Sequence, residues 1–300
     1  DAHDGIPREV FIVADEFNDF AGTGNLDFLS MLGVLWDWDD EDTTYKQRFK
    51  NTKSISIFQP TVSILSGNTH AGFKLAFPEQ ALGQGFLSRL VLVHSEPSGK
   101  KVSFPKPPPA GVADALKERL TQIRETVRGA AVRSKEAEQA LDTIYRTFKD
   151  LEDYRFKSYS SRRYTHLLKL CLLVAAMRLS TTVELKDVIL ANSILTYTES
   201  SMPKALGEFG RSKDSDAQHN IMTALYESHR PLGVEDLWKV VSRDLDKTSR
   251  LVELLQSLTQ AGKIQLVPNK PGYFLPVQRP VVSPTASYVD LSLLKEYKAS

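Results

Sequence analysis

The first third of the chain alternates short apolar runs with polar loops. The runs are EVFIVAD at 9–15, KSISIFQ at 53–59, TVSILSG at 61–67 and SRLVLVHS at 88–95. Continuous apolar strands bounded by polar turns are typical of a parallel sheet covered on both faces. We therefore expect an α/β domain over residues 1–104. The proline-rich stretch FPKPPPAG at 104–111 cannot continue a helix or a sheet and marks its end.

The pattern then changes to apolar residues at three- and four-residue steps, which predicts a helical bundle over 105–210. The polar stretch GRSKDSD at 210–216 is a predicted linker. Residues 211–278 read as three helices and a hairpin with its turn at Pro268 to Pro271, the order of a winged helix. The tail, 279–300, is expected to dock on a partner or to fray.

Composition narrows the class of protein. The chain has 41% hydrophobic and 25% charged residues and a net charge of +1, which excludes a uniformly basic nucleic-acid binder and leaves local patches as the means of contact. The single cysteine, Cys171, has no partner for an intramolecular disulfide, so a cytoplasmic setting is expected. No apolar stretch approaches the ~20 residues of a membrane span. The six histidines are scattered, so no metal besides Mg²⁺ is predicted.

The segment VFIVADEF at 10–17 is a predicted strand that ends in two acids. Ligands collect at the carboxyl edge of parallel sheets, where Asp15 would hold Mg²⁺ and Glu16 would activate a water molecule for nucleotide hydrolysis. A buried strand that ends in a solvated acidic turn is the alternative. The strand TVSILSGN ends in Gly67 and Asn68, whose amide would bind a γ-phosphate and the attacking water. An ordinary Gly-Asn turn is the alternative there.

Arginines at two further positions are candidate phosphate ligands. Arg89 precedes the apolar run LVLV, where it would reach a nucleotide on a neighbouring subunit, unless it is only a surface residue. Arg162 and Arg163 stand in the first turn of a predicted helix, where cations oppose the helix dipole. Their positions indicate phosphate contact or, alternatively, pairing with acidic neighbours.

Two basic segments are candidate DNA contacts. In YKQRFKNTKSISIF at 45–58, basic residues alternate with aromatic ones, a pattern that suits a single strand threading a pore. In DKTSR at 246–250, basic residues begin the third helix of the predicted winged helix. An exposed amphipathic hairpin and a protein-binding winged helix are the respective alternatives. The candidate residues are Lys46, Arg48, Lys50, Lys53, Lys247 and Arg250.

These motifs together resemble an AAA+ ATPase. Four features occur in the order that this family uses. They are a strand that ends in acids, a strand that ends in asparagine, a Ser-Arg pair and a helical lid that begins with arginine. The segment FLSRLVLV at 86–93 resembles the arginine-finger segment of MCM-type helicases, and SRRYTHLLKL at 161–170 looks like their lid. When Lys169 is aligned with the second basic position of that lid, Arg162 takes the position of the lid's leading arginine, which is called the second sensor. The segments LSMLGVLWDWDDE and GFLSRL are closer to the helicase-type ATPase found beside primases in phages and prophages. The resemblance covers about residues 8 to 200.

The resemblance implies a partial AAA+ core, a helical lid and a winged helix. It also implies ATP and Mg²⁺ as cofactors, with Arg162 and Arg163 near the nucleotide, and a homo-oligomeric ring, expected to be hexameric, on single-stranded DNA. A primase is a candidate partner. The expected function is DNA unwinding in replication by ATP hydrolysis.

One family feature is missing from these residues. PSGKK at 97–101 lacks the required glycine and AGTGN at 21–25 lacks the lysine, so no P-loop is present. A P-loop upstream of Asp1 would make the chain part of a motor. A nonhydrolysing adaptor that binds DNA or protein is the alternative.

Overall fold

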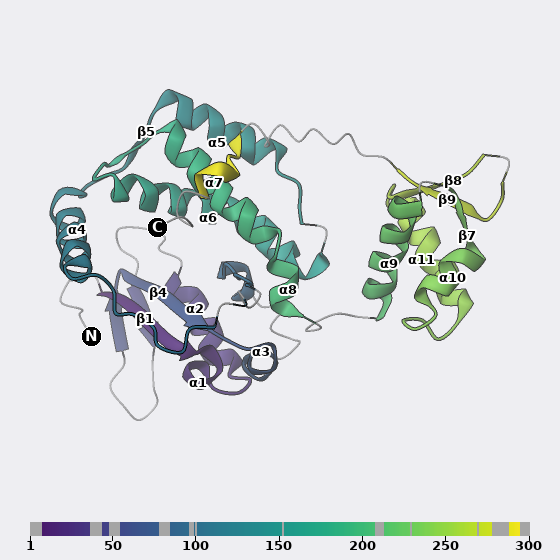
Figure 1. Cartoon of the computed structure of the whole chain (residues 1–300), viewed down its shortest axis with the longest axis horizontal. Coiled ribbons are helices and arrows are strands. Elements are labelled where there is room, and N and C mark those ends of the chain that lie inside the picture. Colours follow the sequence, from purple (N-terminus) through teal and green to yellow (C-terminus); the bar gives the residue numbers. More distant parts are fainter. Residues whose placement is uncertain are drawn as a thin grey trace. The chain divides into compact units, whose positions relative to one another are not determined.

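A computed structural model of the chain shows a mixed α/β protein with two compact units (Figure 1). Residues 1–209 and 283–300 form the first unit, and residues 210–282 form the second. The α/β part and the helical part, predicted as separate domains, belong to the first unit together. The structure describes residues 8–36, 44–47, 55–77, 85–95, 99, 101–151, 153–207, 213–228, 230–268, 270–277 and 288–294.

Two parallel strands form the centre of the α/β part. Strand β1 (Arg8–Glu16) pairs with β4 (Pro60–Gly67) in a register that places Val10 opposite Val62 and Ile12 opposite Ile64. Because side chains alternate between the faces of a strand, Val62 and Ile64 point to one face, where they pack on a buried aromatic cluster. Helices α1 (Phe17–Ala21), α2 (Leu26–Trp36) and α3 (His70–Ala76) supply half of the buried residues of that cluster.

The opposite face of this strand pair carries exposed apolar side chains. Phe11 and Val13 on β1 are each 66% exposed, and Leu65 on β4 is 62% exposed. The sequence predicts a sheet that is covered on both faces, and the described residues cover only one. The predicted strand at 88–95 is also wrong: Leu87–Arg89 form the 3₁₀ turn η2, and residues 90–95 have no strand partner among the described residues, although Leu90 and Leu92 pack on the core.

The other predicted strand, at 53–59, forms a separate hairpin. Strand β2 (Thr44–Gln47) pairs antiparallel with β3 (Ile55–Phe58), so this segment is not part of the parallel sheet. Parallel pairing of the runs at 53–59 and 61–67 would need a crossover connection, and the single residue between them is too short for one. A β-hairpin needs no crossover, because its two antiparallel strands are joined by a turn.

A helical bundle fills the middle of the chain, as its spacing predicts. Helices α5 (Lys135–Thr147), α6 (Lys157–Met177) and α7 (Leu185–Glu199) bury a common apolar core that includes Leu141, Leu167 and Leu195. The short 3₁₀ turn η3 (Tyr154–Phe156) precedes α6, and α8 (Met202–Leu206) follows α7. The two-residue strands β5 (Val132–Arg133) and β6 (Thr182–Val183) pair in parallel. None of the described helices is long and apolar enough to cross a bilayer.

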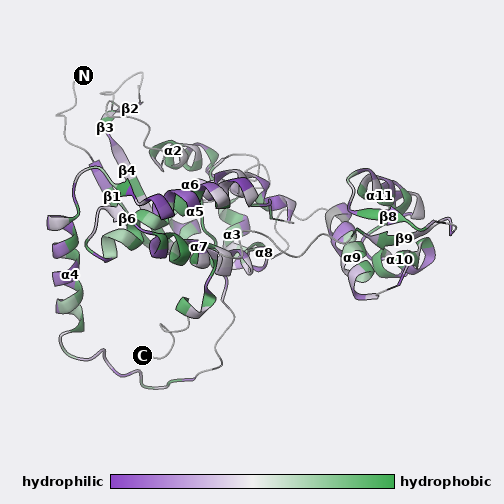
Figure 2. Cartoon of the chain, turned by 90° about the horizontal axis from the view of Figure 1, so that it is seen from above, coloured by the Kyte–Doolittle hydropathy of each residue, from purple (hydrophilic) through white to green (hydrophobic). Residues whose placement is uncertain are grey.

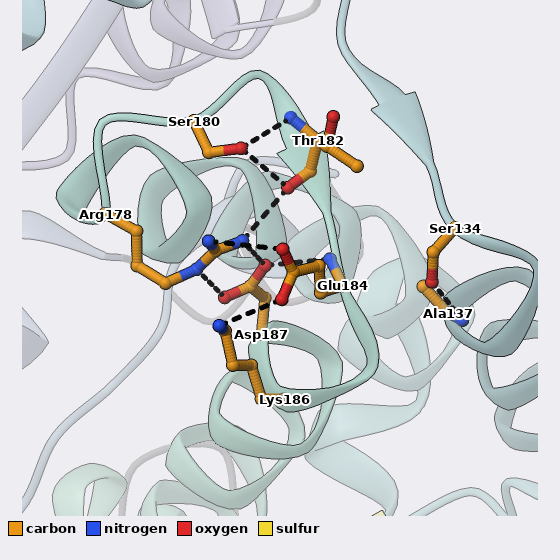
Figure 3. A network of polar contacts seen from close by, with 8 residues as sticks. All are labelled: Ser134, Ala137, Arg178, Ser180, Thr182, Glu184, Lys186 and Asp187. Atoms are coloured by element: carbon orange, nitrogen blue, oxygen red, sulfur yellow. Dashed lines mark hydrogen bonds and ion pairs between the residues drawn. The ribbon is translucent and has the colours of Figure 1, made fainter.

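An ion-pair network fixes the turn between α6 and α7 (Figure 3). The Arg178 guanidinium donates to both carboxylate oxygens of Asp187 and to the Thr182 carbonyl, and it lies 3.5 Å from Glu184. Asp187 also accepts from the Glu184 backbone at 2.8 Å and so caps α7. Burial raises the pKa of Asp187, but the hydrogen bonds and the charge of Arg178 outweigh it and lower that pKa.

Helix α4 (Val112–Thr126) has no buried residue, and Figure 2 shows it standing apart from α5, α6 and α7. Val112, Leu116 and Leu120 recur on one face of it and are exposed. The helix is linked to the bundle by a hydrogen bond from the Arg119 guanidinium to the Met177 carbonyl at 2.5 Å.

The second unit has its own core. Helices α9 (Lys213–Ser228), α10 (Val234–Val241) and α11 (Thr248–Gln260) precede the hairpin of β8 (Ile264–Leu266) and β9 (Tyr273–Pro276), which agrees with the predicted order. The short strand β7 (Leu232–Gly233) completes a sheet of order β7-β9-β8.

After the second unit the chain returns to the first. The Asn192 carboxamide on α7 donates to the Tyr288 carbonyl at 2.9 Å, and the Ser193 hydroxyl accepts from the Asp290 backbone at 2.8 Å. The 3₁₀ turn η5 (Leu291–Leu294) ends this docked segment. The described part of the tail is therefore docked within its own chain.

Candidate functional site

The parallel pairing brings the predicted acids and amide to one edge of the sheet. Because both strands run in the same direction, their carboxyl ends meet, and Glu16 lies opposite Gly67. The register is irregular between Ala14 and Glu16, and the Ser66 hydroxyl donates to the Ala14 carbonyl at 2.7 Å. A Cβ on Gly67 would lie 3.0 Å from the Asp15 carbonyl, so the strands approach closely here. Asp15, Glu16 and Asn68 thus lie at the same edge of the strand pair.

A second amide, Asn18, lies at the same edge and was missed by the sequence analysis. The carboxamide oxygens of Asn68 and Asn18 lie 2.2 and 2.6 Å from the position that a Cβ on Gly72 would take, so both converge on the first turn of α3. The buried Asn18 Oδ1 has no hydrogen-bond partner among the described residues. The available signal was the position of Asn18, two residues after Glu16 and inside the aromatic segment FNDF. A buried amide in such a segment needs polar partners, which the acidic edge could provide.

The N-terminus of α3 is arranged by local hydrogen bonds. Thr69 caps the helix, its hydroxyl accepting from the Gly72 backbone at 3.0 Å, and the Asn68 carboxamide accepts from the Thr69 backbone at 3.0 Å. These bonds hold the Asn68 side chain beside the carboxyl end of β1. The cap therefore positions the Asn68 carboxamide.

The donor atoms at this edge fit Mg²⁺ held jointly with phosphates. Asp15 and Glu16 are exposed carboxylates, and Mg²⁺ prefers oxygen ligands, usually one or two carboxylates completed by water and substrate phosphates. Within the described ranges no three His, Cys, Asp or Glu side chains group as a metal site, so these residues do not form an all-protein cage. The arrangement suits a metal that arrives with a nucleotide.

Arg89 lies on η2, and its guanidinium packs within its own chain. Nη1 donates to the Gly85 carbonyl at 2.7 Å, and the Arg89 Cζ lies 5.8 Å from the centre of the Trp36 ring at the end of α2. A Cβ on Gly33 would lie 3.5 Å from Nη1. To reach a neighbouring subunit, the side chain would have to leave this position.

The two predicted arginines of α6 have different environments. Arg163 is buried: its guanidinium donates to Glu199 at 2.7 Å and to the Asn192 carboxamide at 2.9 Å, and its Cζ lies 4.5 Å from the Phe148 ring. It is engaged in the core of the bundle. Arg162, the preceding residue, is half-buried.

Arg162 shares a face of α6 with His166 and Lys169, which follow it at four and seven residues. His166 is buried, and its Nε2 donates to the Ser88 carbonyl at 2.9 Å. Burial lowers the pKa of His166; the bond to Ser88 opposes this, and the nearby charges of Lys169 and Arg162 lower the pKa further. This face therefore contacts the segment that carries Arg89.

The basic hairpin is described in part. Lys46 is exposed on β2, next to half-buried Tyr45. Arg48, Lys50 and Lys53 lie outside the described residues. The antiparallel pairing of β2 with β3 agrees with the predicted hairpin-like segment.

In the second unit, Lys247 is exposed directly before α11. Arg250, in the first turn of the helix, contacts the carboxylates of Asp214 and Glu253. A phosphate would have to compete with these two acids for the guanidinium. On the β8–β9 hairpin, the Lys270 ammonium lies 3.7 Å from the centre of the Tyr273 ring.

Comparison of the sequence with protein-family models and with curated proteins finds no match. The function of this chain must therefore be inferred from the geometry of the two units and from the motifs.

Proposed function

We propose that this chain is part of a ring-forming DNA helicase or translocase of the AAA+ type, which couples ATP hydrolysis to DNA unwinding in replication. The observation that carries the proposal is the shared edge of β1 and β4, where Asp15, Glu16, Asn68 and Asn18 meet. Two acids and two amides at the carboxyl end of parallel strands suit phosphoryl transfer to water.

Each side chain has a part in the proposed reaction. Glu16 takes a proton from the attacking water, whose oxygen forms the new bond to the γ-phosphorus while the bond to the β-phosphate oxygen breaks. Asn68 orients this water and the γ-phosphate. Asp15 would hold Mg²⁺, which supplies charge neutralisation to the phosphates when bound. Arg89 and Arg162 would contact the phosphates from a neighbouring copy. Arg163 has no part in the proposed reaction, because it stabilises the helical bundle.

The exposed apolar face of the sheet supports a larger α/β domain. Phe11, Val13 and Leu65 present their side chains where a second layer would pack in a doubly covered parallel sheet. We propose that a P-loop half of the motor, encoded upstream of Asp1, supplies the missing strands and this layer. ATP hydrolysis then requires both halves.

The second unit is proposed to be a winged helix. Three helices followed by a β-hairpin match that motif, with α11 as the helix that would approach DNA and the β8–β9 hairpin as the wing. Lys247 and Arg250 would contact phosphates from the start of α11. On the first unit, Lys46 and the basic residues after it in the β2–β3 hairpin would contact single-stranded DNA in the pore.

The test is ATP turnover by the complete protein, the chain expressed with its upstream segment, with and without single-stranded DNA. Glu16→Gln should lower turnover by at least about 100-fold while ATP still binds, because general-base catalysis contributes about 10² to 10⁴. Glu9→Gln is the matched control, since Glu9 lies near the opposite end of the same strand. Equal turnover in the two variants would refute the assignment of Glu16.

The nonhydrolysing adaptor is the second candidate, favoured by the absence of a P-loop from these 300 residues. It predicts DNA or protein binding by the second unit with no ATP turnover in the complete protein. The same experiment decides between the two, because an upstream segment without a Gly-rich loop ending in Lys-Ser/Thr leaves no means of binding the triphosphate.

A further inference from the structure

Two sequence motifs that are more than 40 residues apart meet around the Arg89 guanidinium. Gly33 and Trp36 belong to LSMLGVLW on α2, and Gly85 belongs to GFLSRL around η2. The absence of a side chain at both glycines makes room for the guanidinium, and the Trp36 ring lies beside it at 5.8 Å. We call Gly33, Gly85 and Trp36 the arginine cradle.

The cradle also contacts the lid helix. The Lys169 ammonium lies 3.3 Å from the centre of the Trp36 ring and donates to the Trp36 carbonyl at 3.2 Å. The His166 ring is 5.5 Å from the same indole and is bonded to Ser88, the residue before Arg89. Trp36 thus has cations from two elements near its ring, a favourable arrangement for an indole. A movement of Arg89 would change the surroundings of Trp36 and of α6 together.

We propose that the arginine cradle is the resting site of Arg89 and that a nucleotide phosphate on a neighbouring copy draws the guanidinium out of it. Trp36 is then a positioning residue, which holds Arg89 in the cradle, the withdrawn state. The environment of the Trp36 ring changes when Arg89 leaves. The second part rests on the proposed motor function. The first part does not, because it concerns contacts within one chain.

The contacts of the withdrawn state suit a reversible device. Within the cradle, the Arg89 guanidinium donates to the Gly85 carbonyl, lies beside the Trp36 ring and packs against the two glycines. A triphosphate offers charge-assisted, bidentate hydrogen bonds, which are stronger than those to a neutral carbonyl. A phosphate is therefore a stronger acceptor for the guanidinium than the Gly85 carbonyl is.

The two glycines provide a variant and its matched control. A Cβ on Gly85 would lie 2.9 Å from Arg89 Nη1, too close for both to stay, and the flexible arginine gives way at little cost. A Cβ on Gly33 would lie 3.5 Å from the same atom, an ordinary contact, and alanine suits a helix interior. Gly85→Ala should therefore expel the guanidinium, while Gly33→Ala should leave it in place.

The readout is the fluorescence of Trp36 in the full chain, with Trp38 and Trp238 replaced by phenylalanine so that one indole remains. Without ligand, Gly85→Ala and Arg89→Ala should share an emission maximum and intensity that differ from those of the parent, and Gly33→Ala should match the parent. Identical spectra for Gly85→Ala and Gly33→Ala would overturn the cradle.

The complete protein, with the same tryptophan replacements and with any upstream tryptophans also replaced, is then titrated with MgATP while binding is followed separately by equilibrium dialysis. Bound ATP should move the parent spectrum toward that of Arg89→Ala and leave Arg89→Ala unchanged. Bound ATP without a spectral change would overturn release by phosphate. If no ATP binds, that result refutes the motor function, and the ligand-free comparison alone decides the cradle.

Discussion

At the scale of single residues, the candidate site depends on what Gly72 lacks. Its missing side chain leaves the space into which the Asn18 and Asn68 carboxamides converge at the start of α3. A glycine inside a seven-residue helix weakens that helix, since glycine is about 1 kcal/mol less favourable than alanine there. The space beside Gly72, which the two carboxamides occupy, explains why a glycine stands there although it weakens the helix.

Gly72→Ala should therefore move both carboxamides rather than simply strengthen α3. The new methyl group would lie 2.2 Å from Asn68 Oδ1 and 2.6 Å from Asn18 Oδ1, and both side chains must rotate away. Nuclear magnetic resonance would detect shifted side-chain amide signals for both asparagines. Ala71→Gly, a change in the same turn, should leave these signals in place. Unmoved amides in Gly72→Ala would contradict the described convergence.

His166 makes the stability of the first unit dependent on pH. Its folded-state pKa lies below the usual 6.5, chiefly because of burial, so the unfolded chain takes up a proton before the folded one does. Stability is therefore constant above about pH 6.5 with respect to this group and falls as the pH drops below it. The urea midpoint of the first unit should be lower at pH 5.5 than at pH 7.5.

The change His166→Gln should reduce this pH dependence, since glutamine does not titrate. His70→Gln is the control, because His70 is an exposed histidine of the same unit. A midpoint difference between the two pH values that is equally large in His166→Gln and in the parent would show that another group is responsible.

At the scale of elements, helix α6 separates two adjacent arginines by their direction. Successive residues of an α-helix point about 100° apart, so Arg162 and Arg163 cannot share an environment. Arg162 lies on the face with His166 and Lys169, toward the segment of Arg89. Arg163 points into the bundle, where its side chain is 4% exposed and that of Glu199 is 8% exposed.

Arg163→Met should destabilise the first unit by about 3 kcal/mol or more, because it leaves the buried Glu199 carboxylate without its cation. Adding Glu199→Gln should recover much of this loss, since the uncompensated charge is then removed. Urea unfolding of the two single variants and the double variant measures the coupling between them.

The exposed pair of Arg146 and Asp142 on α5 is the matched comparison. Its side chains are 72% and 56% exposed, and water screens their attraction. The variant Arg146→Met should have an unfolding midpoint close to that of the parent. A loss as large as that of Arg163→Met would contradict the importance of burial.

At the scale of the whole molecule, the second unit is connected to the first through both of its ends. The second unit is inserted between residues 209 and 283 of the first, and the tail returns to α7, where Asn192 contacts both Arg163 and Tyr288. The buried polar network of the bundle therefore extends to a segment that comes after the second unit in the sequence. The two units have separate apolar cores.

Deletion of residues 283–300 should consequently destabilise the first unit and leave the second unchanged. The first unit loses the packing of Tyr288 on the bundle and two hydrogen bonds to Asn192 and Ser193. Hydrogen exchange measured by mass spectrometry should show faster exchange in α7 and unaltered exchange in α9 and α11. Faster exchange in all three helices would indicate that the units unfold together.

The sequence by itself determined the local elements and the ends of the strands. Helical spacing predicted the bundle and the three helices of the second unit, because burial of one helix face requires apolar residues at three- and four-residue steps. The apolar runs that end in Asp15–Glu16 and in Gly67–Asn68 predicted one site, because parallel strands bring their carboxyl ends together. Both predictions depend on local periodicity and chain direction, which are written in the sequence.

Only the tertiary structure decided what each run pairs with and where each side chain points. The apolar runs at 53–59 and 88–95 read like strands of the same sheet, yet one pairs in a separate hairpin and the other has no strand partner among the described residues. The convergence of Asn18 with Asn68, the burial of Arg163 and the arginine cradle all join residues distant in the chain. Such contacts depend on how the elements pack in three dimensions. The periodicity of a sequence does not specify which distant residues will touch.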